Sequence, residues 1–382
     1  MNVLIIRTFP DILDPKSYNI QEIGLARALT KKGITCGIVL YNGKNNDTIE
    51  TIEVLDDNSK IIGTITVYRL HGWNFLKNGI FPGLKKIIAE YDVLQVHEYD
   101  QISSWLLYTF PKKPVVLYHG PYYHPFNRGY NLKCSVFDNT FLRIGRKKHN
   151  LPCLTKSRAA AEFLQKKGFT NTTAVGVGLD DTAFSTKHQN VEKDSARDAA
   201  HFTLLYVGKI EERRNVMFLL DLFSELASEN ASLRFHIIGN GETSYLEQFL
   251  KKAEPLIKSG RLLYEKSATQ TRLAQIYQTS ELMVFPTNYD IFGMVLLEAA
   301  YFGLPVLSSR NGGADMLIDN GKNGIVLNNF EIDSWKTEIL KLCENQELYQ
   351  SIRNKWQAED QKRLLWDGIA DQFILAYTSV LQ

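Results

Sequence analysis

The chain has 382 residues, of which 44% are hydrophobic and 23% charged, and its formal net charge is +2. This composition is typical of a folded globular protein with room for two domains, and it excludes a disordered or fibrous chain. A charge close to neutral, without a basic face interleaved with aromatic residues, argues against a nucleic-acid partner.

No targeting segment or membrane span is expected. The apolar run at residues 1–6 ends at Arg7 without a small-residue cleavage site, and no window reaches the ~20 apolar residues of a transmembrane helix. Cys36, Cys134, Cys153 and Cys343 lie far apart and lack metal-binding spacing, which favours reduced thiols in a cytoplasmic protein.

Charge is distributed unevenly along the chain. Up to residue 184 there are 23 basic and 16 acidic residues, whereas the remainder has 21 and 26. A basic first half suits an anionic partner, such as a phospholipid surface or a phosphate-bearing acceptor. A fluctuation without functional meaning is the alternative.

The first half alternates between strand-type and helix-type segments. We expect strands at residues 2–7, 35–41, 92–97, 114–120, 152–157 and 173–178, and helices at residues 19–33 and 157–168. Such alternation predicts a parallel sheet built from strand–helix–strand units. Residues 185–200 are polar and aperiodic, which is typical of a linker.

A second alternating series follows the linker. We expect strands at residues 202–208, 233–241, 261–266 and 281–287, helices at residues 216–229, 243–260 and 272–280, and a helical tail at 348–381. The predicted fold is α/β, with two doubly wound Rossmann-like domains facing a central cleft. Their bounds are 1–184 for the first, 185–200 for the linker and 201–364 for the second, with a C-terminal helix, 365–382, returning to the first domain.

Ligands of such folds bind beyond the carboxyl ends of the strands, and the stretch "NYDIFGMVLLEAAYFGLPVLSSRNGG" follows one of them. Its helix is predicted to begin near Phe292 or Gly293 and to end at Gly303. Because that helix is apolar nearly all round, Glu298 needs a polar partner. A pair of sugar hydroxyls would suit a carboxylate, and an arginine is the alternative. The free amides of Phe292, Gly293 and Met294 offer a place for a phosphate or sugar oxygen.

Cations lie at the start of another helix of the second domain. Gly208 and Lys209 follow the strand at 202–208, with Arg213 and Arg214 just before the helix. Cations are unfavourable at a helix start unless an anion is present, which points to a phosphate held by Lys209 and Arg214. A solvated basic loop is the alternative. Gly239 and Gly241 form a further turn that would let a base or ribose come close.

Together these motifs resemble the retaining glycosyltransferases of family four, which have a two-domain B-type fold. The family has a motif in which seven residues separate an acidic residue from a Glu. Asp290 and Glu298 match it in "DIFGMVLLEAAYFGLPV". "YVGKIEERRN", "IIGNGE", "NGGADMLIDNGKNGIVL" and the "YHG" at 118–120 are also similar to family segments. The resemblance covers essentially the whole chain and is most specific around the two acids.

The resemblance implies transfer of a sugar from a nucleotide sugar to an acceptor hydroxyl, with the anomeric configuration kept. The first domain would bind the acceptor and the second the nucleotide sugar, a substrate, without any metal or other cofactor. The resemblance implies that Glu298 holds the ribose and that Lys209 and Arg214 neutralise the leaving diphosphate. Asp290 and the amides of Ile291, Phe292 and Gly293 would hold the donor sugar. His119 would approach the donor sugar from the first domain.

Some positions depart from the family pattern and leave the substrates open. Asp290 replaces a commoner Glu, and Ile291 stands where Gly is frequent. The loop after the first strand contains "DPKSYN" instead of a paired-glycine loop, so the family's acceptor contacts cannot be assigned to this loop. Tyr122 and Tyr123, next to His119, are candidates for an acceptor wall, and a surface turn is the alternative.

The implied acceptor is a growing glycan, plausibly lipid-linked, and the implied location is cytoplasmic, on the inner face of a membrane. Residues 141–149 with Lys112 and Lys113 could touch an anionic membrane, or be a solvated helix end. The spacings of His97 with Glu98 and of His119 with His124 fit no metal-ligand set. The rival functions are a nucleotide-sugar epimerase of the same fold and a nucleotide-binding scaffold with little turnover.

Overall fold

The computed structural model describes residues 1–382 except for residues 16, 19, 57, 146–149, 183, 185–200 and 359–360, and describes the backbone alone at 145, 357 and 358. The predicted linker at 185–200 therefore lies outside the described residues. The chain divides into two compact units. The first comprises Met1–Asp180 and Lys362–Gln382, and the second comprises Asp181–Gln361.

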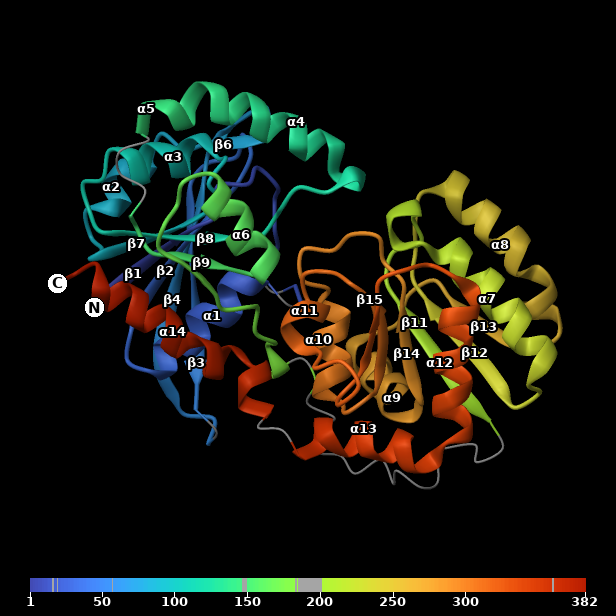
Figure 1. The fold of residues 1–382 in the computed structure, drawn as a ribbon. Coiled ribbons are helices and arrows are strands. Elements are labelled where there is room, and N and C mark those ends of the chain that lie inside the picture. The colour runs from blue at the N-terminus through green and yellow to red at the C-terminus, as the bar shows by residue number, and fades with distance from the viewer. Residues whose placement is uncertain are drawn as a thin grey trace. The chain divides into compact units, whose positions relative to one another are not determined.

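An eight-stranded sheet forms the centre of the first unit (Figure 1), in the order β10-β9-β8-β7-β1-β2-β4-β3. Its strands are β1 (Asn2–Ile6), β2 (Thr35–Tyr41), β3 (Thr48–Leu55), β4 (Ile61–Leu70), β7 (Val93–His97), β8 (Val115–His119), β9 (Cys153–Thr155) and β10 (Thr172–Ala174). All neighbours pair in parallel except β3 with β4. The central strands are apolar throughout because helices cover both faces of the sheet.

The helices of the first unit are α1 (Gln21–Lys31), α2 (Leu84–Ile88), α3 (Ile102–Thr109), α4 (Arg128–Phe137), α5 (Arg143–Gly145), α6 (Arg158–Lys166) and α14 (Trp366–Ser379). A π-helical turn, Asp138–Leu142, joins α4 to α5. A short hairpin of β5 (Trp73–Phe75) and β6 (Asn78–Ile80) stands apart from the main sheet. The sequence did not predict β3 to β6. Of these, β3 and β5 are largely exposed, which interrupts the apolar pattern.

The C-terminal helix α14 packs on α1, which confirms the prediction that it returns to the first unit. Lys32, directly after α1, pairs with Asp371 at 2.8 Å, and the hydroxyl of Tyr377 donates to the Gln95 side chain on β7. The predicted continuous helical tail is wrong, since α13 (Gln346–Ala358) and α14 are separate helices. The helix is interrupted between them because the segment before α14 joins the first unit. There the amide of Leu179 donates to the Leu364 carbonyl at 2.8 Å.

The second unit has a six-stranded parallel sheet in the order β13-β12-β11-β14-β15-β16. Its strands are β11 (Phe202–Val207), β12 (Leu233–Ile238), β13 (Leu262–Glu265), β14 (Leu282–Phe285), β15 (Val306–Ser309) and β16 (Ile325–Leu327). Its other helices are α7 (Val216–Glu229), α8 (Thr243–Lys258), α9 (Gln270–Thr279), α10 (Met294–Tyr301), α11 (Ala314–Leu317) and α12 (Ile332–Glu344). The prediction of two doubly wound units is confirmed.

The strand orders show where the chain changes its direction of winding through each sheet. In the first unit the chain winds one way from β1 to β2 and the other way from β7 to β8. The neighbouring strands between which the winding changes direction are β7 and β1 in the first unit, and β11 and β14 in the second unit. The crevice at the carboxyl ends of such a pair is where open parallel sheets bind ligands. The loops after β11 and β14 therefore set the place of the site.

Candidate active site

A pocket of about 730 Å³ lies in the second unit at the carboxyl ends of β11, β12 and β13. Its volume is within the usual range for small-molecule sites. Four of the residues predicted for the site line it, namely Gly208, Lys209, Gly239 and Gly241. The fold thus brings together two sequence motifs that are about 30 residues apart.

The two glycines of the β12 loop are required by a neighbouring loop. A Cβ atom at Gly239 would lie 1.7 Å from the Gly208 carbonyl oxygen, and one at Gly241 would lie 1.9 Å from that of Ile210. The amide of Ile210 donates to the Asn240 carbonyl at 2.9 Å, which ties the loops together. The sequence analysis attributed these glycines to a base or ribose passing close. Backbone packing accounts for them without a ligand.

Charge in this pocket is mixed. Lys209 is exposed, and its carbonyl accepts a 2.8 Å hydrogen bond from the Tyr206 hydroxyl, which fixes the backbone under the lysine. Lys266 lines the pocket from the loop after β13. Glu211 and Glu212 line it as well. An anion here is therefore attracted by the two lysines and repelled by the two carboxylates, so its position is restricted to the lysine side.

Arg214 and Asp290 form an ion pair that joins the loops after β11 and β14. Asp290 is 8% exposed, and the Arg214 guanidinium lies 5.2 Å from the centroid of the Phe285 ring. The Nε atom of Arg214 is also 3.7 Å from a carboxylate oxygen of Glu211. The two residues that the sequence assigned to the diphosphate and to the donor sugar thus contact each other directly at the switch point of the sheet.

The start of α10 differs from the prediction. The helix begins at Met294, and Gly293 precedes it with φ +74°, a left-handed conformation that glycine adopts without steric cost. The carboxylate Oδ1 of Asp290 accepts the amides of Phe292 at 3.2 Å and Gly293 at 3.0 Å. These amides were expected to be free for a ligand. In this structure Asp290 occupies both, because a carboxylate satisfies the unpaired donors of a helix start.

Glu298 lies inside α10 and is 5% exposed. Its Oε2 accepts a 2.7 Å hydrogen bond from the hydroxyl of Tyr277, on α9. The sequence analysis considered sugar hydroxyls or an arginine as partners and missed the tyrosine. The signal available in the sequence was a predicted helix at 272–280 with one hydroxyl-bearing aromatic residue on it.

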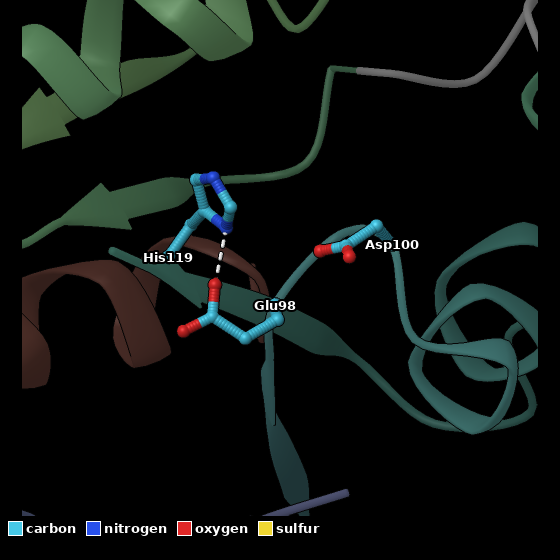
Figure 2. Close-up of side chains that lie close together, drawn as sticks. All are labelled: Glu98, Asp100 and His119. Atoms are coloured by element: carbon cyan, nitrogen blue, oxygen red, sulfur yellow. Dashed lines mark ion pairs between the residues drawn. The ribbon is translucent and has the colours of Figure 1, made fainter. Parts of the chain in front are cut away.

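In the first unit, His119 ends β8 and its ring is fully buried. Its Nδ1 atom lies 2.5 Å from Oε2 of Glu98, and Figure 2 shows this pair. The ring stacks on Phe163, with centroids 5.6 Å apart. Among the described residues, Nε2 of His119 has no hydrogen-bond partner. The sequence did not identify Glu98 as the partner of His119.

Several groups hold the Glu98 carboxylate in its charged form. Burial raises the pKa of Glu98, but His119, Lys156 and the amide of Gly120 lower it more strongly, to about 2. The Gly120 amide donates to Oε2 at 3.2 Å. Glu98 also has φ +61°, an uncommon conformation for a residue with a side chain. This strained backbone places the carboxylate next to the imidazole.

Glu98, Asp100 and His119 bring one oxygen or nitrogen ligand atom each to within 4.8 Å of one another (Figure 2). Such a set could in principle coordinate a transition metal. Each carboxylate already has a partner within the protein, because Asp100 pairs with Lys133 at 2.8 Å and Glu98 contacts Nδ1 of His119. The arrangement therefore fits an ion-pair network better than a metal site.

The remaining predicted residues lie near this network. Tyr122 is half-buried, and Tyr123 is 45% exposed. The ammonium of Lys167 donates to the Tyr123 hydroxyl at 2.6 Å and lies 4.4 Å from the ring centroid. Tyr123 is thus a fixed, partly exposed aromatic face, as an acceptor wall would need. His97 bonds to Glu22 at 3.2 Å, away from Glu98.

Residues 188–359 match the family model described as Glycosyl transferases group 1. The second unit of the chain thus carries the match to the group 1 glycosyl transferases. Lys209, Arg214, Asp290 and Glu298 all fall within the matched residues. His119 and Glu98 do not.

Curated relatives of this chain are distant. A D-inositol 3-phosphate glycosyltransferase of Segniliparus rotundus is 23% identical over 187 residues, which is 48% of this chain and 41% of that protein. A mannosylfructose-phosphate synthase of Agrobacterium fabrum is 24% identical over 177 residues, or 45% of this chain and 39% of that protein. The matches span about two fifths of these relatives.

Solved structures resemble this chain over nearly its whole length. Anabaena HepE, in complex with UDP and glucose, is 14% identical, with a TM-score of 0.68 and 99% of each chain covered. A sucrose-phosphate synthase of Thermosynechococcus elongatus is 16% identical, with the same TM-score and 99% and 98% covered. These likenesses confirm the two-sheet B-type glycosyltransferase fold. Among the described residues, no helix is both long and apolar enough to cross a membrane.

Proposed function

We propose that this group 1 glycosyl transferase is a retaining enzyme that moves a sugar from a nucleotide-diphosphate sugar to an acceptor hydroxyl without a bound metal. The observation that carries the proposal is the Arg214–Asp290 pair, which joins the loops after β11 and β14 where the sheet reverses direction. The pocket lined by Lys209 ends at the same loop, through Glu211 and Glu212. A diphosphate placed there has Lys209 and Arg214 at hand.

The chemistry asked of these cations is charge stabilisation. When the bond between the sugar and the diphosphate breaks, negative charge accumulates on the leaving phosphate oxygens. Fixed positive groups stabilise that charge more in the transition state than in the ground state, so they raise the rate as well as the affinity. Arg214 is held ready by Asp290 and by the Phe285 ring. We propose that the diphosphate shares the guanidinium with Asp290 when it binds.

The nucleoside is assigned to the pocket and to Glu298. Ribose hydroxyls can donate to a carboxylate, and the Glu298 carboxylate can accept them while it keeps its hydrogen bond from Tyr277. The donor sugar is assigned to Asp290 and to the amides of Ile291, Phe292 and Gly293. Two of these amides already donate to Oδ1 of Asp290, so the sugar would bind to them together with the carboxylate as one unit.

His119 is assigned to the donor sugar from the first unit, with Glu98 as its positioning residue. The Glu98 carboxylate occupies Nδ1, which leaves Nε2 as the atom that can meet a substrate oxygen. His119→Ala should lower kcat with little change in the donor KM. Glu98→Gln keeps an oxygen near Nδ1 and should lower kcat less.

We propose a growing, lipid-linked glycan as the acceptor and a cytoplasmic location at the inner face of a membrane. The basic first half of the chain and the partly exposed Tyr123 support an acceptor that carries sugar and phosphate. The predicted membrane contact at residues 141–149 is described only in part. Ile144 is 66% exposed within it, and Leu142 is buried.

A thermal-shift screen with nucleotide sugars tests the donor. Because the solved HepE structures contain UDP and UDP-glucose, uridine diphosphate sugars come first. A ligand at about 100 times its Kd should stabilise the protein by about 2.7 kcal/mol. If no nucleotide sugar raises the Tm, the proposed function is wrong.

Product analysis with the identified donor alone separates the rivals. A transferase hydrolyses the donor slowly or leaves it intact, and needs an acceptor for turnover. An epimerised donor would establish the epimerase instead. Donor binding without transfer or hydrolysis, for any acceptor tried, would favour a scaffold.

A further inference from the structure

The hairpin of β5 and β6 presents apolar side chains to solvent. Trp73, Phe75 and Leu76 are 57%, 54% and 75% exposed. The two turn residues, Leu76 and Lys77, have φ +50° and +61°. Two-residue turns of this hand favour Asn and Gly, which adopt positive φ at little cost. A leucine that is strained here and gains no burial within the chain indicates a role outside it.

The base of the hairpin is held firmly. The side chain of Asn78 donates to the carbonyls of Phe75 and Leu76 at 3.1 and 2.9 Å and accepts the Ile102 amide, at the start of α3, at 2.9 Å. The amide of Gly79 donates to the Thr8 carbonyl at 2.8 Å. The apolar tip is therefore a rigid projection next to the loop that follows β1, at the ligand-binding edge of the sheet.

Helix α4 continues the exposed apolar surface. Leu132 and Val136, one turn apart, are 68% and 57% exposed. Lys133 of α4 pairs with Asp100, which lies two residues before α3. Figure 1 shows α3, β6 and α4 on one side of the first unit. We name Trp73, Phe75, Leu76, Lys77, Leu132 and Val136 the hairpin–α4 surface.

The charges around this surface are positive. Lys77, Arg128 and Arg143 are exposed on the hairpin, on α4 and on α5. Within residues 71–80 and 126–145 the one acidic residue is Asp138, and Lys167 neutralises it. Outside these ranges, the exposed Asp47 accepts the His71 amide at 2.6 Å. Apolar side chains flanked mainly by cations are complementary to the interface of an anionic bilayer. Tryptophan is also a preferred residue at that interface.

We propose that the hairpin–α4 surface docks on anionic phospholipid, with the hairpin tip inserted among the headgroups. This places the ligand-binding edge of the first sheet beside the bilayer, where a lipid-linked acceptor would be. The inference rests on the proposed function only for the identity of that acceptor. Docking itself requires no sugar transfer.

Tryptophan fluorescence and vesicle co-sedimentation test the proposal on the full chain. Of the five tryptophans, all in described positions, the four other than Trp73 are at most 7% exposed. The emission should therefore shift to the blue with phosphatidylglycerol vesicles and not with phosphatidylcholine vesicles, and added salt should weaken binding. Leu76→Asn suits the turn and removes the leucine, so the fold should survive while vesicle affinity falls about tenfold.

Leu375→Asn is the matched control. Leu375 is 70% exposed on α14, which Figure 1 shows on the other side of the first unit. This variant should bind vesicles like the wild type. The proposal is overturned if the wild type does not bind anionic vesicles or if both variants bind equally well. It is also overturned if sedimentation reveals a dimer that Leu76→Asn dissociates, because the surface then joins two copies. Vesicle binding is measured without a donor. A failure to bind vesicles therefore does not contradict the proposed sugar transfer, and a failure of sugar transfer does not contradict the docking.

Discussion

The hydroxyl of Tyr277 donates a 2.7 Å hydrogen bond to Oε2 of Glu298, and both side chains are buried. The pair joins α9 to α10 across the second unit. One oxygen of the carboxylate is thereby satisfied within the protein. Because a carboxylate can accept more than one hydrogen bond, the same acid can stabilise the fold and also accept a ligand.

Tyr277→Phe should lower the free energy of unfolding by about 1–3 kcal/mol, because it leaves a buried carboxylate oxygen without this donor. Glu298→Gln keeps an acceptor and should cost less. Urea unfolding of both single variants and of the double variant measures the coupling between the two side chains. Additive effects would show that the charge of the carboxylate adds nothing to this hydrogen bond.

Arg214→Ala should reduce the affinity for a nucleoside diphosphate about tenfold to a hundredfold, since a charge-assisted hydrogen bond contributes about 1.5–3 kcal/mol. The affinity for the nucleoside alone should change little. Calorimetry with both ligands makes the comparison.

Arg213→Ala is the control for this prediction. Arg213 is the adjacent cation, but its guanidinium donates to the Tyr289 carbonyl at 2.8 Å and pairs with Glu211 at 2.7 Å. This variant should keep diphosphate affinity close to the wild type. Equal losses in the two variants would indicate a general charge effect, against a specific phosphate contact.

Stability should fall in acid partly through Glu98. On folding, the pKa of Glu98 is lowered from 4.5 to about 2, because its interactions with His119, Lys156 and the Gly120 amide outweigh burial. Its contribution is thus complete above pH 4.5 and is lost as the pH falls through about 2. A lowering of this size corresponds to about 3 kcal/mol at neutral pH.

Urea unfolding at several pH values between neutral and pH 3 checks this dependence. Glu98→Gln should show a smaller loss of stability in acid than the wild type, with Glu22, whose pKa is also about 2, responsible for part of the remainder. Glu53→Gln, at an exposed position on β3, should follow the wild-type curve. An unchanged curve for Glu98→Gln would contradict the role of the ion pair.

Gly293→Ala should destabilise the protein by about 1–2 kcal/mol, because φ +74° is unfavourable for any residue with a Cβ atom. Gly129→Ala, in α4, is the matched substitution. A Cβ atom there meets nothing within 4 Å, and alanine favours helix, so stability should rise by about 0.5–1 kcal/mol. Thermal unfolding distinguishes the two variants by the opposite signs of their Tm changes.

Local sequence patterns were sufficient for the main elements of the fold. The apolar strands, the polar stretch at 185–200 and the periodic helices each depend on neighbouring residues alone, which is why two doubly wound units could be predicted. Residues 48–80 were missed because β3 and the hairpin expose much of their surface. The break between α13 and α14 was missed because a partner at Leu179, far away in sequence, causes it.

The sequence singled out the candidate site residues, since Lys209, Arg214 and Asp290 follow strand ends and Glu298 lies inside an apolar helix, where their charge has no local explanation. It could not assign their partners. The contacts of Arg214 with Asp290, Glu298 with Tyr277 and His119 with Glu98 join residues that 21 to 76 positions separate. Long-range pairings of this kind depend on the order and register of strands, which arise from packing of the whole sheet and leave no trace in a local pattern.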